Sequence, residues 1–306
     1  EYAVARLNSD GSLDPTFGTD GRAMPHVTPG DDFAYDIALQ ADGKIILAGK
    51  SRPSANDDAS LVRLTATGQL DTSFNGTGKI LIAGTGGLWY ELFHGVTVQQ
   101  DGKIVVVGGS SPAGDAGLDF VLFRFNTNGS FDSNFGSGGR VITPIGYTGT
   151  ARSVALQPDG KIIAGGFSNS GSANFAAVTR YQANGMLDLE FGNSGKATIE
   201  INPRRWGVVK SVLRQSDGRI IGVGSETESG SFGDFMVARF DQNGYLDQEF
   251  GTGGLVYTKF GYEDSAANDA ALQSDQTLIV VGYAKTPAGL YGIGVARYAL
   301  TTMDAP

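Results

Sequence analysis

The chain has 306 residues, of which 41% are hydrophobic, and its formal net charge is −9. The acidic balance leaves no basic surface for nucleic acid, and no apolar run reaches the roughly 18 residues that a membrane-spanning helix needs. Cysteine is absent, which excludes disulfides and zinc–thiolate sites. The 46 glycines favour strands joined by tight turns over long helices.

One segment recurs along the chain, first as "RLNSDGSLDPTFGTDGR" from Arg6. The later copies begin at Arg63, Arg124, Arg180 and Arg239, and a shortened sixth copy, "YGIGVARYAL", places Arg297 at the same point. Consecutive arginines are 57, 61, 56, 59 and 58 residues apart. A period of this length is typical of the blades of a β-propeller.

The first copy looks like a calcium loop, because Asp10, Ser12 and Asp14 alternate around a glycine. A calcium loop needs oxygen ligands at such positions, and Met186 stands in the Ser12 column of the fourth copy. We therefore predict a structural loop, called the staple loop, within the segment from Arg6 to Arg22 and within the matching segments of the other copies. Its aspartate is expected to cap turn amides and pair with the arginine, and its phenylalanine to pack on the sheet.

Each repeat reads as four strands joined in order. In the third copy they are "RSVALQPDG", "KIIAGGFS", "FAAVTRYQ" and, after the staple loop, "KATIEI". The first strand carries apolar residues on both sides, which indicates burial of both faces. The fold class predicted is all-β, a single β-propeller domain over residues 1–306 with five blades of four antiparallel strands.

The third strand occurs six times, whereas a ring of five blades needs five. We predict that residues 291–299 complete the last blade and that residues 22–27 add its outer strand, so that the two ends of the chain close the ring. Residues 1–8 would then be surplus, and their deletion would cost little stability.

These motifs resemble the bacterial delta-60 repeat family, whose repeats combine an arginine-ended strand, a DGxLDxxFG-type loop and an xDGKI hairpin. The resemblance covers essentially the whole chain. It implies a β-propeller in a secreted or surface protein of a bacterium, and it supplies no catalytic residue. Two features depart from the pattern: Gln276 replaces the hairpin glycine of the last copy, and that copy ends in "TTMDAP" in place of a staple loop.

The loops from a fourth strand to the next first strand differ among the copies, unlike the staple loops. Exposed aromatic side chains there suit sugar rings or protein side chains, although each could also cover the core beneath its own loop. The candidate ligand-binding residues on this face are Trp89, Tyr90, His94, Tyr147, Arg152, Trp206, Lys210 and Tyr262.

The charged side chains on the same face form an acidic group and a basic group. The basic group could bind an anion. The acidic group is a weak candidate for Ca²⁺, against the alternative of solvated loop charges. Its members are Asp31, Asp32, Glu263 and Asp264. No other metal or cofactor is expected.

Standard enzyme signatures are missing from the sequence. Asp36 and Asp269 share one column with Gly95, Ser153 and Ser211. Two carboxylates near the axis could act as the acid and base of a glycoside hydrolase, or they could cap turns.

The sequence favours a non-enzymatic binding or adhesion module, extracellular or displayed on the surface of a bacterium, with a glycan or protein ligand on the strand four-to-one loop face. The rival hypotheses are a carbohydrate-active hydrolase and a scaffold that binds nothing. A nucleic-acid partner and a membrane span are not expected.

Overall fold

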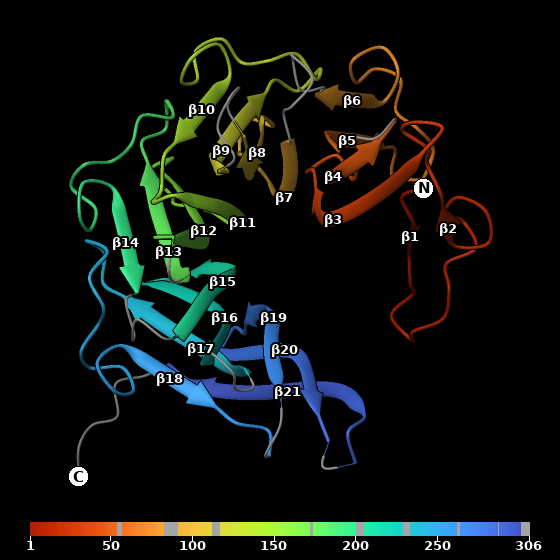
Figure 1. The fold of residues 1–306 in the computed structure, drawn as a ribbon. Helices are drawn as coiled ribbons and strands as arrows, with labels where there is room; N and C mark the ends of the chain where they lie inside the picture. The colour runs from red at the N-terminus through yellow and green to blue at the C-terminus, as the bar shows by residue number, and fades with distance from the viewer. Residues whose placement is uncertain are drawn as a thin grey trace. The chain divides into compact units, whose positions relative to one another are not determined.

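The computed structural model describes residues 1–53, 57–82, 91–111, 117–171, 174–199, 205–228, 233–261, 264–286 and 288–300. The strands in these ranges form antiparallel sheets in which neighbours in the chain are neighbours in the sheet (Figure 1). No helix in the described ranges is long and apolar enough to cross a membrane. The prediction of an all-β chain is confirmed.

The chain separates into two compact units, residues 1–144 and 145–306. The first unit holds a two-stranded sheet and two four-stranded sheets. Their strands are β1 (Val4–Ala5) and β2 (Arg22–Ala23); β3 (Asp31–Leu39), β4 (Ile45–Arg52), β5 (Asp58–Leu64) and β6 (Lys79–Ile82); and β7 (Glu91–Val98), β8 (Ile104–Ser110), β9 (Asp119–Phe125) and β10 (Arg140–Thr143).

The second unit holds two four-stranded sheets and one three-stranded sheet. The four-stranded sheets are β11 (Thr148–Leu156), β12 (Ile162–Asn169), β13 (Asn174–Tyr181) and β14 (Lys196–Ile199), and β15 (Arg205–Arg214), β16 (Ile220–Glu228), β17 (Gly233–Phe240) and β18 (Leu255–Thr258). The last sheet is β19 (Ser265–Leu272), β20 (Thr277–Lys285) and β21 (Tyr291–Ala299). The expected five repeats of strands are therefore present, four of them with four strands.

The hydrophobic core lies between consecutive sheets of each unit. In the first unit, Phe93 of β7 meets Phe123 of β9 edge to face at 5.4 Å, and both belong to a cluster that includes Ile46 and Leu61 of the preceding sheet. Two further clusters join β11–β14 to β15–β18 and β15–β18 to β19–β21. Burial of this apolar surface is the main force that holds each sheet to the next.

The two ends of the chain follow the prediction only in part. Strand β21 pairs with β20 along its whole length, as expected. Arg22 and Ala23 form β2, which pairs with β1. Residues 1–8 are not surplus, because the Tyr2 side chain is fully buried and its hydroxyl lies 2.7 Å from Ser60 Oγ. The short β1–β2 pair packs on β4 and β5, as a four-stranded sheet packs on its neighbour. The pattern of strands in the sequence does not specify this packing.

The staple loops have the predicted arginine–aspartate pair at their centre. Arg63 Nε lies 2.7 Å from Asp71 Oδ2, and the guanidinium stands 4.5 Å from the centre of the Phe74 ring. Asp71 Oδ1 accepts hydrogen bonds from the amide and hydroxyl of Ser73. Burial raises the pKa of the Asp71 carboxyl, but the Ser73 hydrogen bonds and the Arg63 charge outweigh burial and lower it to about 2. The loop is held by its own side chains.

Four of the five staples also tie their sheet to the following one. The arginine donates from Nη1 to a backbone carbonyl roughly 60 residues further along the chain, just after the next third strand. The donor and acceptor pairs are Arg6 and Ala66, Arg63 and Thr127, Arg180 and Gln242, and Arg239 and Leu300. Backbone bonds such as Asn75 N to Asn128 O, at 2.8 Å, run in parallel. The staple is thus a joint between sheets as well as a loop cap.

Candidate functional site

Four of the candidate residues, Trp89, Tyr90, Tyr262 and Glu263, lie outside the described residues. The others can be placed, and three of them, His94, Arg152 and Lys210, share one structural feature. Each is the extra residue of a β-bulge in the first strand of its sheet.

The bulge recurs at the same point of all five first strands. In each, the pairing with the second strand skips one residue, here called the bulged residue. The five bulged residues are Tyr35, His94, Arg152, Lys210 and Asn268. A bulge interrupts the ladder and redirects a side chain, and bulges are frequent beside binding and catalytic sites.

A glycine of the second strand stands opposite each bulge: Gly49, Gly108, Gly166, Gly224 and Gly282. At Gly224 a Cβ atom would lie 1.9 Å from the Val208 carbonyl oxygen, and at Gly282 it would lie 2.0 Å from the Ala266 oxygen. Only glycine leaves room for this close approach of the two backbones. The glycine column is therefore the sequence signal of the bulge.

In the first unit the bulged residues form an aromatic pair. The rings of Tyr35 and His94 lie 4.8 Å apart between centroids and are tilted by 44°. Tyr35 is exposed and His94 is half-buried. The next residue of β3, Asp36, accepts hydrogen bonds from Ile37 N at 2.8 Å and from Val96 N of the neighbouring first strand at 2.7 Å. This surface therefore combines two aromatic rings with a carboxylate that accepts hydrogen bonds from two backbone amides.

In the second unit the bulged residues are polar and basic. Lys210 Nζ donates to Asn268 Oδ1 of the next sheet at 2.9 Å. Burial lowers the pKa of the Lys210 ammonium, the nearby positive charge of Arg152 lowers it further, and the Asp264 carboxylate acts in the opposite direction. Arg152 also stands 5.9 Å from the centre of the Phe167 ring. Two cations from neighbouring sheets therefore share one small region.

The residues that follow the bulges link neighbouring first strands. Ser153 Oγ accepts from Val212 N at 3.0 Å, and Ser211 Oγ donates to Asp269 Oδ1 at 2.8 Å. Asp269 Oδ1 also accepts from Ala270 N. Asp36 and Asp269, the pair considered for hydrolysis, are thus bound to amides and a hydroxyl, in the manner of caps. They lie in separate units.

Two predicted aromatic residues are exposed in the second unit. Trp206 of β15 has 53% of its surface exposed, and Tyr147, just before β11, has 64% exposed. Both are among the exposed large hydrophobic residues of the chain. Both remain available for stacking.

Two of the acidic residues considered for Ca²⁺, Asp32 and Asp264, accept hydrogen bonds from the protein's own donors. Asp32 is buried and accepts from Val27 N at 2.9 Å and from the Thr28 hydroxyl at 3.2 Å. Asp264 accepts from Gly233 N at 2.9 Å and from the Tyr283 hydroxyl at 3.1 Å. Asp31 lies at the start of β3. Within the described ranges, no group of three or more acidic or histidine side chains is arranged to hold a metal ion.

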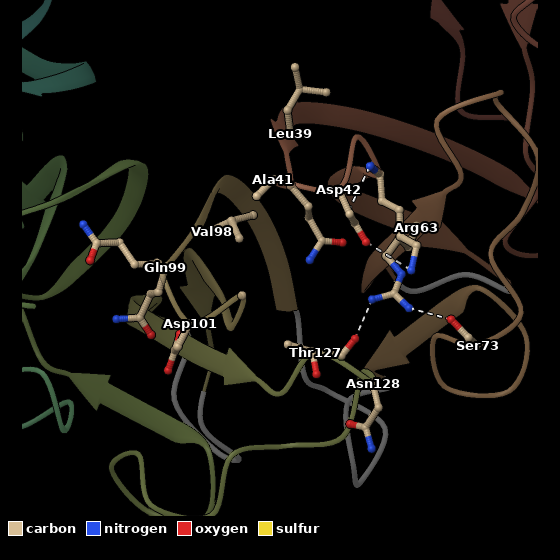
Figure 2. Close-up of a pocket in the computed structure, with 14 residues that line it drawn as sticks. Leu39, Ala41, Asp42, Arg63, Ser73, Val98, Gln99, Asp101, Thr127 and Asn128 are labelled. Atoms are coloured by element: carbon tan, nitrogen blue, oxygen red, sulfur yellow. Dashed lines mark hydrogen bonds and ion pairs between the residues drawn. The ribbon is translucent and has the colours of Figure 1, made fainter.

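A crevice of about 850 Å³ opens at the other end of the strands of the first unit, by the hairpin turns (Figure 2). Figure 2 shows Arg63 on one wall, bonded to the Thr127 carbonyl and to Ser73, with Asp42 and Asp101 from two hairpin turns nearby. A counterpart of about 450 Å³ occurs in the second unit, with Arg180 in the place of Arg63. Both crevices are lined by the repeated scaffold residues, so the bulged strands are the better candidate site.

Sequence reasoning identified three of the five bulged residues and missed Tyr35 and Asn268. The candidate residues were chosen from the sequence by their side-chain chemistry in the variable loops. In the structure, the five bulged residues share a backbone geometry. A glycine recurs at the same point of all five second strands, and this recurrence could have revealed the bulge.

Comparison with known proteins agrees with this fold. The chain matches the family described as domain of unknown function (DUF5122) beta-propeller at residues 1–17, 40–74, 99–135, 157–191 and 215–250, about half of its length. The matched segments contain the hairpins and staple loops. The chain belongs to this family. No curated protein sequence matches it.

Solved structures of similar fold include two proteins of unknown function. One is from Dyadobacter fermentans, with a TM-score of 0.57, 11% identity, and coverage of 90% of this chain and 82% of that one. The other is from Bacteroides caccae, with a TM-score of 0.53, 12% identity, and coverage of 92% and 79%. The polysaccharide lyase Uly1 has a TM-score of 0.51, 13% identity, and coverage of 95% and 63%. At these identities the similarity concerns the fold alone.

Proposed function

We propose that this β-propeller protein is a non-enzymatic binding module whose ligand contacts the bulged residues of the first strands. In this proposal the five sheets form one closed propeller with the first strands around its axis. The parent protein is secreted by a bacterium or displayed on its surface, as the repeat family suggests.

One observation carries the proposal: the same bulge occurs in all five first strands, and each bulge presents a different side chain. Staple residues are alike in every copy and have buried partners, which is the pattern of a scaffold. Bulged residues have an invariant backbone and variable chemistry, which is the pattern of a recognition surface on a rigid support.

The chemistry of the bulged residues suits a glycan. Tyr35 and His94 offer adjacent rings for stacking, and Lys210 and Asn268 offer polar groups to hydroxyl or acidic oxygens. Binding is favoured over hydrolysis because Asp36 and Asp269 already accept hydrogen bonds from the protein's own donors.

Glycan and peptide arrays probed with the full chain test the proposal. The double variants Tyr35→Ala/His94→Ala and Arg152→Ala/Lys210→Ala should each weaken the binding of hits by about tenfold or more, as loss of an interface hot spot does. Asp159→Lys, an exposed hairpin residue at the far end of its strand, should leave binding unchanged. Loss of binding in Asp159→Lys with none in the bulge variants would place the ligand at the hairpin end.

Hydrolysis is measured in parallel on a polysaccharide panel. Release of reducing ends that disappears in both Asp36→Asn and Asp269→Asn would favour the hydrolase. A chain that neither binds nor cleaves any member of these panels would favour the scaffold hypothesis.

A further inference from the structure

The chain contains four Asn–Gly pairs, all of them in staple loops. In such a pair the backbone nitrogen of the glycine can attack the side-chain carbonyl carbon of the asparagine, because glycine has no Cβ to obstruct the approach. The attacking nitrogen must first lose its proton, so a hydrogen bond from this N–H protects the pair. The four pairs are Asn75–Gly76, Asn128–Gly129, Asn184–Gly185 and Asn243–Gly244.

Three of the pairs are protected by the fold. The N–H groups of Gly129, Gly185 and Gly244 each donate to the carbonyl oxygen three residues earlier, at 2.9, 2.9 and 3.2 Å. Gly244, whose hydrogen bond is the longest, also packs on an aromatic ring, since a Cβ there would lie 2.6 Å from Phe191. Each of these nitrogens can react only after its loop opens locally.

The pair at Asn75 lacks this protection. Among the residues that the structure describes, Gly76 N has no hydrogen-bond acceptor. Both residues of the pair are exposed, and a Cβ added at Gly76 would meet no atom within 4 Å. Gly76 N is therefore open to base in the solvent and has room to move towards the Asn75 side chain.

Asparagine is the exception at this point of the staple loop. Asn75 has φ = 52°, and the residues that match it in the other loops are glycines with φ between 52° and 57°. The left-handed conformation disfavours most side chains but admits asparagine. Glycine can therefore replace Asn75 without a change of backbone, which supplies a matched control. The matching glycines are Gly18, Gly136, Gly192 and Gly251.

We propose that Asn75 is a site of spontaneous deamidation, distinguished from the other three pairs by the unbonded N–H of its neighbour. Gly76 N forms a bond to Asn75 Cγ as it loses its proton, and the bond between Cγ and Nδ2 breaks, so that Nδ2 leaves with that proton as ammonia. Water then opens the cyclic imide at either of its carbonyl groups. The product at position 75 is aspartate or isoaspartate, and water is the only co-reactant.

The modification acts on a joint between two sheets. Asn75 N donates to the Asn128 carbonyl of the next staple at 2.8 Å, and Asn75 Nδ2 donates to the Lys79 carbonyl at 3.0 Å. A carboxylate has no N–H to donate, so both products lose the hydrogen bond to Lys79. Isoaspartate also adds one carbon to the main chain beside the hydrogen bond to Asn128. Deamidation therefore weakens the connection of β3–β6 to β7–β10.

Peptide mapping of the folded, full chain after incubation in mildly alkaline buffer tests the proposal. Trypsin leaves each pair in its own peptide, and mass spectrometry measures the converted fraction against a sample digested without incubation. The Asn75 peptide should convert at least about fivefold faster than the others, the factor that breaking one backbone hydrogen bond gives. The peptides are residues 64–79, 125–140, 181–196 and 240–259.

Two controls separate the effect of the fold from that of the local sequence. In urea, where the protecting hydrogen bonds are absent, all four peptides should convert at similar rates. Asn75→Gly should abolish conversion in residues 64–79 and should keep its urea unfolding midpoint after incubation. The midpoint of the incubated wild-type chain should fall.

Equal conversion of the four peptides in the folded chain would overturn the selectivity for Asn75. A peptide 64–79 that stays intact in the folded chain, while urea converts all four, would overturn the site itself. Conversion at Asn75 with an unchanged unfolding midpoint would show that the joint between the sheets does not depend on this loop.

Discussion

The sheets β15–β18 and β19–β21 have the same bulge and differ in nearly everything that holds a sheet in place. In the first, Arg239 is fully buried between Asp247, the Phe250 ring and the Leu300 carbonyl. In the second, the matching Arg297 is 60% exposed and pairs with Asp275 of a hairpin turn. The bulge at Asn268 is present although Arg297 lacks the buried contacts of Arg239. The bulge, which presents a side chain, therefore does not depend on the buried arginine of the staple, which joins neighbouring sheets.

The largest expected effect comes from the two arginines. Arg239→Ala should lower the free energy of unfolding by about 2 kcal/mol or more, because it removes the hydrogen bonds of a fully buried guanidinium to Asp247 and to the Leu300 carbonyl. Arg219 stays 2.9 Å from Asp247 in the variant. Arg297→Ala should leave the unfolding midpoint unchanged, since the ion pair is exposed and screened. Urea unfolding followed by circular dichroism measures both. Equal losses would mean that the last copy has a staple of its own.

The bulge itself can be broken in both sheets. Gly224→Ala and Gly282→Ala should each cost about 2 kcal/mol, since the new methyl group meets a carbonyl oxygen and the strands must shift. The matched control is Gly292→Ala in β21, where the nearest atom to a Cβ is 3.9 Å away. A cost at Gly224 alone would show that the bulge of the last sheet is not constrained by its glycine.

Acid should weaken the stapled sheets. Burial raises the pKa of the Asp188 carboxyl, but Lys161 and Arg180 outweigh burial and lower it below its usual range, and the pKa of Asp71 falls to about 2. A lowered pKa adds stability that is complete above about pH 4, where the unfolded carboxyl is ionised. That stability is lost as the pH falls through the folded value, with a slope of up to about 1.4 kcal/mol per pH unit for each carboxyl.

Unfolding measured from pH 5 to pH 2 checks this expectation. Asp188→Asn should flatten the slope, because the amide does not titrate. An unchanged slope would mean that the staple carboxylates do not set the acid limit.

The hairpin of the last sheet offers a gain in stability. Gln276 has φ = 62°, in the left-handed region, where Gly218 of the preceding sheet has φ = 92°. Gln276→Gly should stabilise the protein by up to about 1 kcal/mol, since the left-handed conformation penalises a side chain. Its exposed hydrogen bond to Ser216 is lost in exchange. Thermal unfolding is the measurement, and Gly218→Gln should shift the melting temperature in the opposite direction.

Removal of divalent cations should have no effect on thermal stability. Because the staple aspartates bind arginine and turn amides, a chelator of divalent cations should leave the melting temperature unchanged. A clear fall would restore Ca²⁺ as a structural ion.

The repeat pattern predicted the staple in detail because its side chains recur column by column, so that the pairing of Arg63 with Asp71 follows from the sequence alone. It did not predict where Tyr2 packs. Strand sequences show that a strand exists but not which sheet it covers, and the buried Tyr2 hydroxyl finds its partner in Ser60, 58 residues away. The bulge escaped prediction because its sequence signal, the glycine opposite it, lies in the partner strand, and three of the five second strands carry a further glycine. Lys210 and Arg152 were selected as loop-face charges, and their closeness depends on that unseen bulge.

The arginine joints have a consequence for how such chains evolve. Four of the arginines donate to a carbonyl about one repeat further on. A segment of about 58 residues copied in tandem therefore brings both halves of its own joint, namely the donor to the copy ahead and the acceptor for the copy behind. Unequal recombination can then change the number of copies without inventing a new interface. Selection is left free to alter one residue per copy, the bulged one, without disturbing its neighbours.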